Sequence, residues 1–64
     1  MYHDAIVKVQ EMIQHCQNQK LKECEIVVTL LGIQARLNLD VDLPEMMALL
    51  EQIEQQSNLL NLKS

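Results

Sequence analysis

Residues 24–43, with the sequence CEIVVTLLGIQARLNLDVDL, decide the fold because they can be interpreted either as a helix or as two strands. If this segment is a helix, only a narrow strip of it faces solvent. The strip consists of four residues spaced 4, 3 and 4 positions apart: Glu25, Thr29, Gly32 and Arg36. At about 100° per residue, the apolar side chains cover roughly 220° of the circumference. We expect a helix this apolar to be packed on two sides, by the rest of the chain or by a second copy.

The same residues also alternate between apolar and polar from Ile33 to Leu43, a period of two that is typical of a half-buried strand. A helix–β-hairpin–helix fold, with strands at about 24–31 and 33–43, is therefore the alternative. A tight hairpin usually contains Asn-Gly or Asp-Gly, and residues 31–34 offer only Gly32. We favour a helix over about 23–37, followed by an extended connector at 38–42. Gly32 would then be a point of close contact between helices, at a cost of ~1 kcal/mol relative to alanine.

The N-terminal segment has the apolar spacing of an amphipathic helix over about residues 2–19. Its apolar residues recur at intervals of 4, 3, 4 and 3, with Ala5 and Met12 beside them: Tyr2, Ile6, Val9, Ile13 and Cys16. Asn18 is a candidate for a left-handed residue that ends the helix.

The C-terminal segment predicts a helix over about residues 43–61. Asp42 is a candidate N-cap, Pro44 suits the first turn, and Glu45 is placed as in a capping box. The apolar stripe again has spacings of 4, 3, 4 and 3: Met46, Leu50, Ile53, Ser57 and Leu60.

Together these segments predict an all-α chain, a compact three-helix bundle that occupies residues 1–64 as a single small domain. A chain of 64 residues buries only about 60% of its unfolded surface, so we expect self-association to add to its core. We therefore predict a homodimer. Its expected oligomer core consists of the apolar residues of the middle helix: Ile26, Val27, Leu30, Leu31, Ile33 and Leu37.

Charge and hydropathy exclude two classes of partner. The net charge is −4, and the chain has no cluster of Lys or Arg with interleaved aromatic residues, so we expect no nucleic-acid binding. The sequence lacks the run of about 20 apolar residues that a membrane span requires. Met1 is followed by Tyr-His-Asp without a cationic segment, which predicts no secretory signal and a cytoplasmic location. Cys16 and Cys24 are accordingly expected to be reduced thiols.

The few reactive side chains do not form a recognisable catalytic or metal site. His3, His15, Cys16 and Cys24 lack the paired spacing of zinc ligands, so we expect no metal and no cofactor. If the first two helices are antiparallel, Cys16 and Cys24 flank one turn, and a disulfide is geometrically conceivable. No nucleophile–base set is evident, so we expect no enzymatic activity.

These observations predict a non-enzymatic small regulatory or adaptor protein of a bacterial cytoplasm, acting by helix-mediated protein–protein interaction. Its partner would carry a basic or helical surface. The candidate partner-binding residues are Met47, Leu59, Leu62, Glu51 and Glu54. One alternative is a small assembly subunit or chaperone that folds on a cognate protein. Another is a thiol-based redox or metal-responsive switch that uses Cys16 and Cys24.

Overall fold

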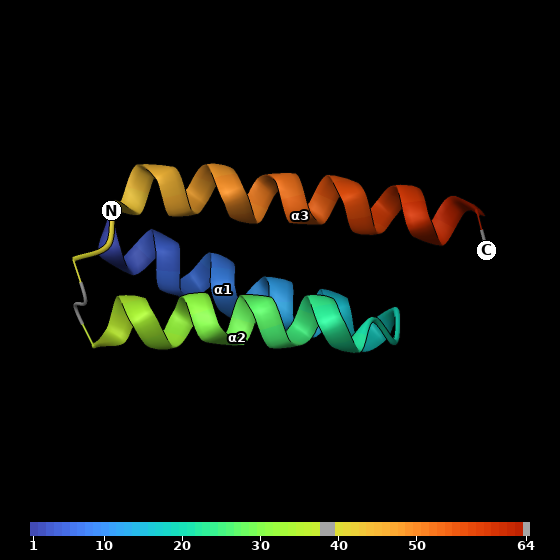
Figure 1. The fold of residues 1–64 in the computed structure, drawn as a ribbon, viewed down its shortest axis with the longest axis horizontal. Coiled ribbons are helices and arrows are strands. Elements are labelled where there is room, and N and C mark those ends of the chain that lie inside the picture. The colour runs from blue at the N-terminus through green and yellow to red at the C-terminus, as the bar shows by residue number, and fades with distance from the viewer. Residues whose placement is uncertain (38–39, 64) are drawn as a thin grey trace.

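The chain forms three helices, as the spacing of its apolar residues predicted. The computed structural model describes the backbone of residues 1–37 and 40–63 and the side chains of residues 1–37 and 40–58. The helices are α1 (Tyr2–Asn18), α2 (Lys22–Arg36) and α3 (Leu43–Lys63). Figure 1 shows that α1 and α3 run in the same direction. The helix that lies between them in the sequence, α2, runs in the opposite direction. The helix–β-hairpin–helix alternative is wrong, because residues 24–36 are helical and no strand occurs in the described part of 24–43.

The turn between α1 and α2 is a Schellman motif. The Leu21 amide donates to the Cys16 carbonyl at 2.9 Å, and the Lys20 amide donates to the Gln17 carbonyl at 3.1 Å. Lys20 holds the left-handed conformation that this motif requires, with φ of 59°. The prediction that Asn18 is the left-handed residue is therefore wrong. Asn18 is the last helical residue, and the motif places its left-handed residue two positions later.

The start of α3 is fixed by Asp42, which confirms the predicted N-cap. Asp42 Oδ1 accepts a hydrogen bond from the Glu45 amide at 3.2 Å, and the Asp42 carbonyl accepts one from the Met46 amide at 2.9 Å. The predicted extended connector is wrong at Asp40, whose φ is 52°. The remainder of that prediction at positions 38 and 39 lies outside the described residues.

The core is a single layer of apolar side chains along the axis of the bundle. Its fully or almost fully buried members are Ala5, Val9, Met12, Cys16, Val28, Ala35, Met46 and Leu50. On α1 the buried line is displaced from the predicted stripe, since Ile6 and Ile13 are only partly buried and Tyr2 is 49% exposed. The buried line of α1 is instead Ala5, Val9, Met12 and Cys16, on a helix that contacts both α2 and α3.

Gly32 lies at a close contact between α1 and α2, as predicted. A Cβ atom added at Gly32 would lie 2.7 Å from Val9 Cγ1. The placement of Gly32 on the solvent strip is therefore wrong, although Thr29 and Arg36 are exposed as expected. Glu25 is only partly exposed, and its Oε1 accepts a hydrogen bond from Gln17 at 3.0 Å.

Candidate interaction surface

The side of α2 that faces away from the core carries a continuous apolar line. Four residues spaced 4, 3 and 4 apart form it, and we call them the α2 seam: Ile26, Leu30, Ile33 and Leu37. Their exposed fractions are 59%, 54%, 43% and 63%, in that order. Because such spacing keeps side chains on one face of a helix, the four lie along one edge of the molecule. The chain thus covers only one side of α2, where packing on two sides was expected.

The exposed apolar surface on the outer side of α2 extends beyond the seam itself. Val27, which is 44% exposed, extends the seam on one flank. Five aliphatic side chains that are each about half exposed present on the order of 500 Å² of apolar surface, within the range of the largest patch on a typical monomer. A patch of that size on a chain of 64 residues makes the outer side of α2 the candidate interaction surface among the described residues.

The α2 seam is exposed because a different line of α2 suits close packing against α1. The inward line contains Val28, Gly32 and Ala35, all of them buried. Small side chains allow two helix axes to approach closely, whereas the larger side chains of the seam would hold them apart. Because the small residues of α2 face α1, the large aliphatic residues of the seam point outward.

The charges of α2 balance, although the whole chain is acidic. Lys22 and Arg36 offset Glu23 and Glu25, so the net charge of −4 resides on other parts of the chain. A shallow hollow of about 370 Å³ lies beside the seam, lined by Lys22, Glu25, Ile26, Thr29 and Leu30. The outer side of α2 is thus an apolar and electrically neutral surface.

The residues predicted as an oligomer core fall into two groups. Ile26, Val27, Leu30, Ile33 and Leu37 are exposed on the outer side of α2. Leu31 instead is half-buried and packs against the core of its own chain. The structure therefore brings five of the six predicted residues together on one accessible surface.

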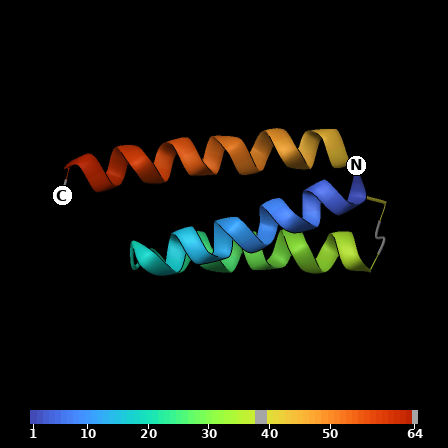
Figure 2. The same cartoon turned by 180° about the vertical axis from the view of Figure 1, so that it is seen from behind.

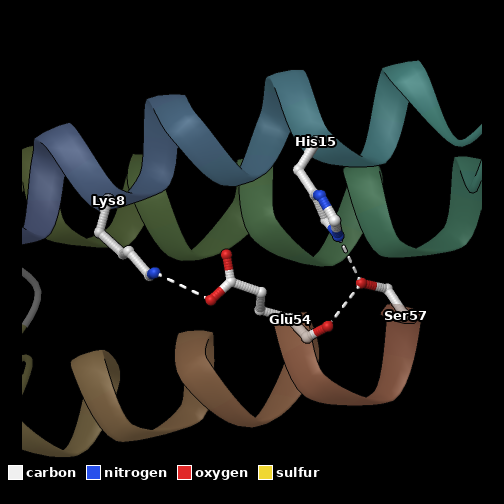
Figure 3. Close-up of polar contacts among 4 residues, drawn as sticks. All are labelled: Lys8, His15, Glu54 and Ser57. Carbon is white, nitrogen blue, oxygen red and sulfur yellow. Dashed lines mark hydrogen bonds and ion pairs between the residues drawn. The ribbon is translucent and has the colours of Figure 1, made fainter. Parts of the chain in front are cut away.

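The residues predicted to bind a partner on α3 do not form a comparable surface within the described residues. Met47 is half-buried against the core, and Glu51 is exposed. Glu54 lies between helices, where its Oε1 is 3.2 Å from Lys8 Nζ on α1 (Figure 3). The side chains of Leu59 and Leu62 lie outside the described residues.

A second polar contact between α1 and α3 involves His15 and Ser57, two residues that no sequence pattern connects. His15 Nε2 lies 2.7 Å from Ser57 Oγ, and Ser57 Oγ donates to the Glu54 carbonyl at 2.8 Å (Figure 3). A serine hydroxyl has one proton, so when that proton is donated to the Glu54 carbonyl, His15 Nε2 is the donor in its contact with Ser57. The contact joins the last turn of α1 to α3.

Cys16 and Cys24 form a disulfide, so the prediction of free thiols is wrong. The Schellman turn brings the last turn of α1 beside the first turn of α2, with the two Cα atoms 6.0 Å apart. This separation is within the range that a disulfide can span. The structure thus contains the Cys16–Cys24 disulfide that an antiparallel helix pair made conceivable.

Among the described residues, no three His, Cys, Asp or Glu side chains gather where they could hold a metal ion. None of the described helices has the length and apolar character needed to cross a membrane.

Comparisons of the chain with protein-family models, with curated proteins and with solved structures found no match. The α2 seam is the largest feature of the described residues that the fold leaves without a partner in the chain.

Proposed function

We propose that this chain is a non-enzymatic small regulatory or adaptor protein that acts by helix-mediated protein–protein interaction. Its primary partner is a second copy of the same chain, bound through the outer side of α2. The observation that carries the proposal is the α2 seam, a line of four large aliphatic residues that the folded chain leaves exposed.

The spacing of the seam favours another helix as the partner. Residues spaced 4, 3 and 4 apart pack best against a helix that offers an apolar line of the same period, as in coiled coils. Within the described residues, α1 and α3 already use their apolar lines in the core of the monomer. The α2 seam is the line left available, and a second copy supplies it again.

The area of the surface also supports a symmetric pair. In a twofold dimer the same patch is buried on both chains, which doubles the apolar area removed from water. Two seams would bury on the order of 1,000 Å², close to the lower limit for a specific protein–protein interface. Residues beside the seam, such as Thr29 and Gln34, would add to the contact.

The charge distribution permits two acidic chains to meet at this surface. Because the charges of α2 cancel, contact through its outer side brings no excess of like charge together. Contact through α3 would bring its glutamates together.

The experiment is a measurement of native mass by size-exclusion chromatography with light scattering over a range of protein concentrations. We expect a mass near twice 7.4 kDa for the wild-type chain at high concentration. Leu30→Lys should give the monomer mass while retaining helical circular dichroism, because Leu30 is 54% exposed in the monomer. Gln52→Lys is the matched control, since it adds the same charge at an exposed position of α3 and should leave the dimer intact.

Two results would contradict the proposal. A wild-type chain that stays monomeric at every concentration would exclude the second copy as the partner. A dimer that survives Leu30→Lys but is lost with Gln52→Lys would place the interface on α3 instead.

A further inference from the structure

A cleft of about 540 Å³ lies at the end of the bundle where α1 turns into α2. Its walls come from the α1–α2 turn, the first half of α2 and the middle of α3: Lys20, Leu21, Lys22, Glu23, Cys24, Val27, Ile53, Gln56 and Ser57. Figures 1 and 2 show α3 extending past this turn, so that its C-terminal half stands beside the end of the helix pair. The volume is within the range of small-molecule sites.

The two cysteines of the disulfide differ in their exposure and in their access to this cleft. Cys16 is 0% exposed and belongs to the core. Cys24 is partly exposed and lines the cleft. A thiolate attacks a disulfide along the line of the sulfur–sulfur bond and must reach one sulfur directly, so access decides which cysteine is attacked.

We propose that Cys24 is a modification site, at which a small anionic thiol enters from the cleft and forms a mixed disulfide. The incoming thiolate bonds to Cys24 Sγ while the bond from Cys24 Sγ to Cys16 Sγ breaks. Cys16 leaves as a thiolate and takes a proton from water. The exchange conserves the number of disulfides, so it requires no oxidant or reductant other than the thiol itself.

The charges at the cleft favour an anionic thiol. Lys20 and Lys22 both line it, against the single carboxylate of Glu23. This is a local excess of positive charge in a chain of net charge −4. Because opposite charge raises the local concentration of an approaching ion, the two lysines should accelerate entry of a negatively charged thiol.

The first test maps the modified cysteine on the wild-type chain. The oxidised protein is incubated with reduced glutathione, quenched with acid, digested without reduction and analysed by mass spectrometry. We expect glutathione on Cys24 at least about tenfold more often than on Cys16, because only Cys24 is accessible in the folded protein. Glutathione on Cys16, or equal amounts on both residues, would overturn the proposal, as would a chain in which non-reducing digestion finds no Cys16–Cys24 bond.

The second test measures how charge affects the exchange rate. The double variant Lys20→Gln with Lys22→Gln should slow exchange with glutathione by about two- to fivefold at low salt. It should slow exchange with 2-mercaptoethanol less, because the attacking thiolate of 2-mercaptoethanol lacks the additional net negative charge of glutathione. Arg36→Gln is the matched control, because it removes a cation from the opposite end of α2. An equal effect of the double variant on both thiols, or no effect on either, would show that the lysines do not recruit an anionic thiol.

Discussion

At the scale of single residues, Gly32 belongs to the face of α2 that packs against α1. The sequence predicted an apolar arc of roughly 220° around this helix and placed Gly32 on the narrow solvent strip beside it. The missing side chain of Gly32 lets Val9 of α1 approach, and this contact turns the seam outward. Close contact at Gly32 could be predicted, but its burial could not, because that depends on the shape of the facing helix.

We expect Gly32→Ala to destabilise the chain. Alanine gains about 1 kcal/mol in helix propensity, but overpacking typically costs ~1–3 kcal/mol, and the new Cβ would overlap Val9 Cγ1. The net loss should be on the order of 1 kcal/mol in the free energy of unfolding, measured by urea denaturation.

Removing Val9 Cγ1 provides the control. In a Val9→Ala background the overlap disappears, so Gly32→Ala should there be neutral or stabilising. If Gly32→Ala stabilises the chain even with Val9 present, the close contact between α1 and α2 is not as described.

At the scale of elements, the end of a helix could be predicted where hydrogen bonds between residues close in sequence determine it. Asp42, Pro44 and Glu45 predicted where α3 begins, because N-cap bonds form within a few residues of each other. The end of α1 was harder to predict. Its left-handed residue is Lys20, a residue type that carries no turn signal, and Cys16 provides one of the carbonyls that fix the turn.

The cap of α3 gives a second prediction. Asp42→Ala removes the side-chain acceptor of the Glu45 amide and should lower the free energy of unfolding by about 1 kcal/mol. Asp42→Asn keeps an oxygen acceptor at the same position and should remain within a few tenths of a kcal/mol of wild type. Equal losses in both variants, measured by thermal and urea denaturation, would mean that the charge of Asp42 matters and its cap bond does not.

At the scale of the whole molecule, two features lay beyond local patterns. The contacts of Lys8 with Glu54 and of His15 with Ser57 join residues more than forty positions apart, so their pairing emerges only once α1 and α3 are packed. An antiparallel pair of helices made a disulfide between Cys16 and Cys24 conceivable. The expected cytoplasmic location favoured free thiols instead, because the cytoplasm keeps thiols reduced. The three-helix architecture itself followed from the apolar spacing of each segment.

The size of the molecule links its stability to its association. A chain of 64 residues has a small core, and the outer side of α2 remains in water in the monomer. If two copies bury that surface, folding and association are coupled by mass action, so the thermal midpoint should rise with protein concentration. For the wild-type chain we expect a rise of several degrees over a hundredfold range of concentration.

The Leu30→Lys variant separates this effect from intrinsic stability. Its midpoint should be independent of concentration and should match that of the wild-type chain at the dilute limit, because the substituted residue is more than half exposed in the monomer. Gln52→Lys should retain the concentration dependence of wild type. A wild-type midpoint that does not move would mean that α1 and α3 alone stabilise α2, and that its exposed seam contributes nothing to folding.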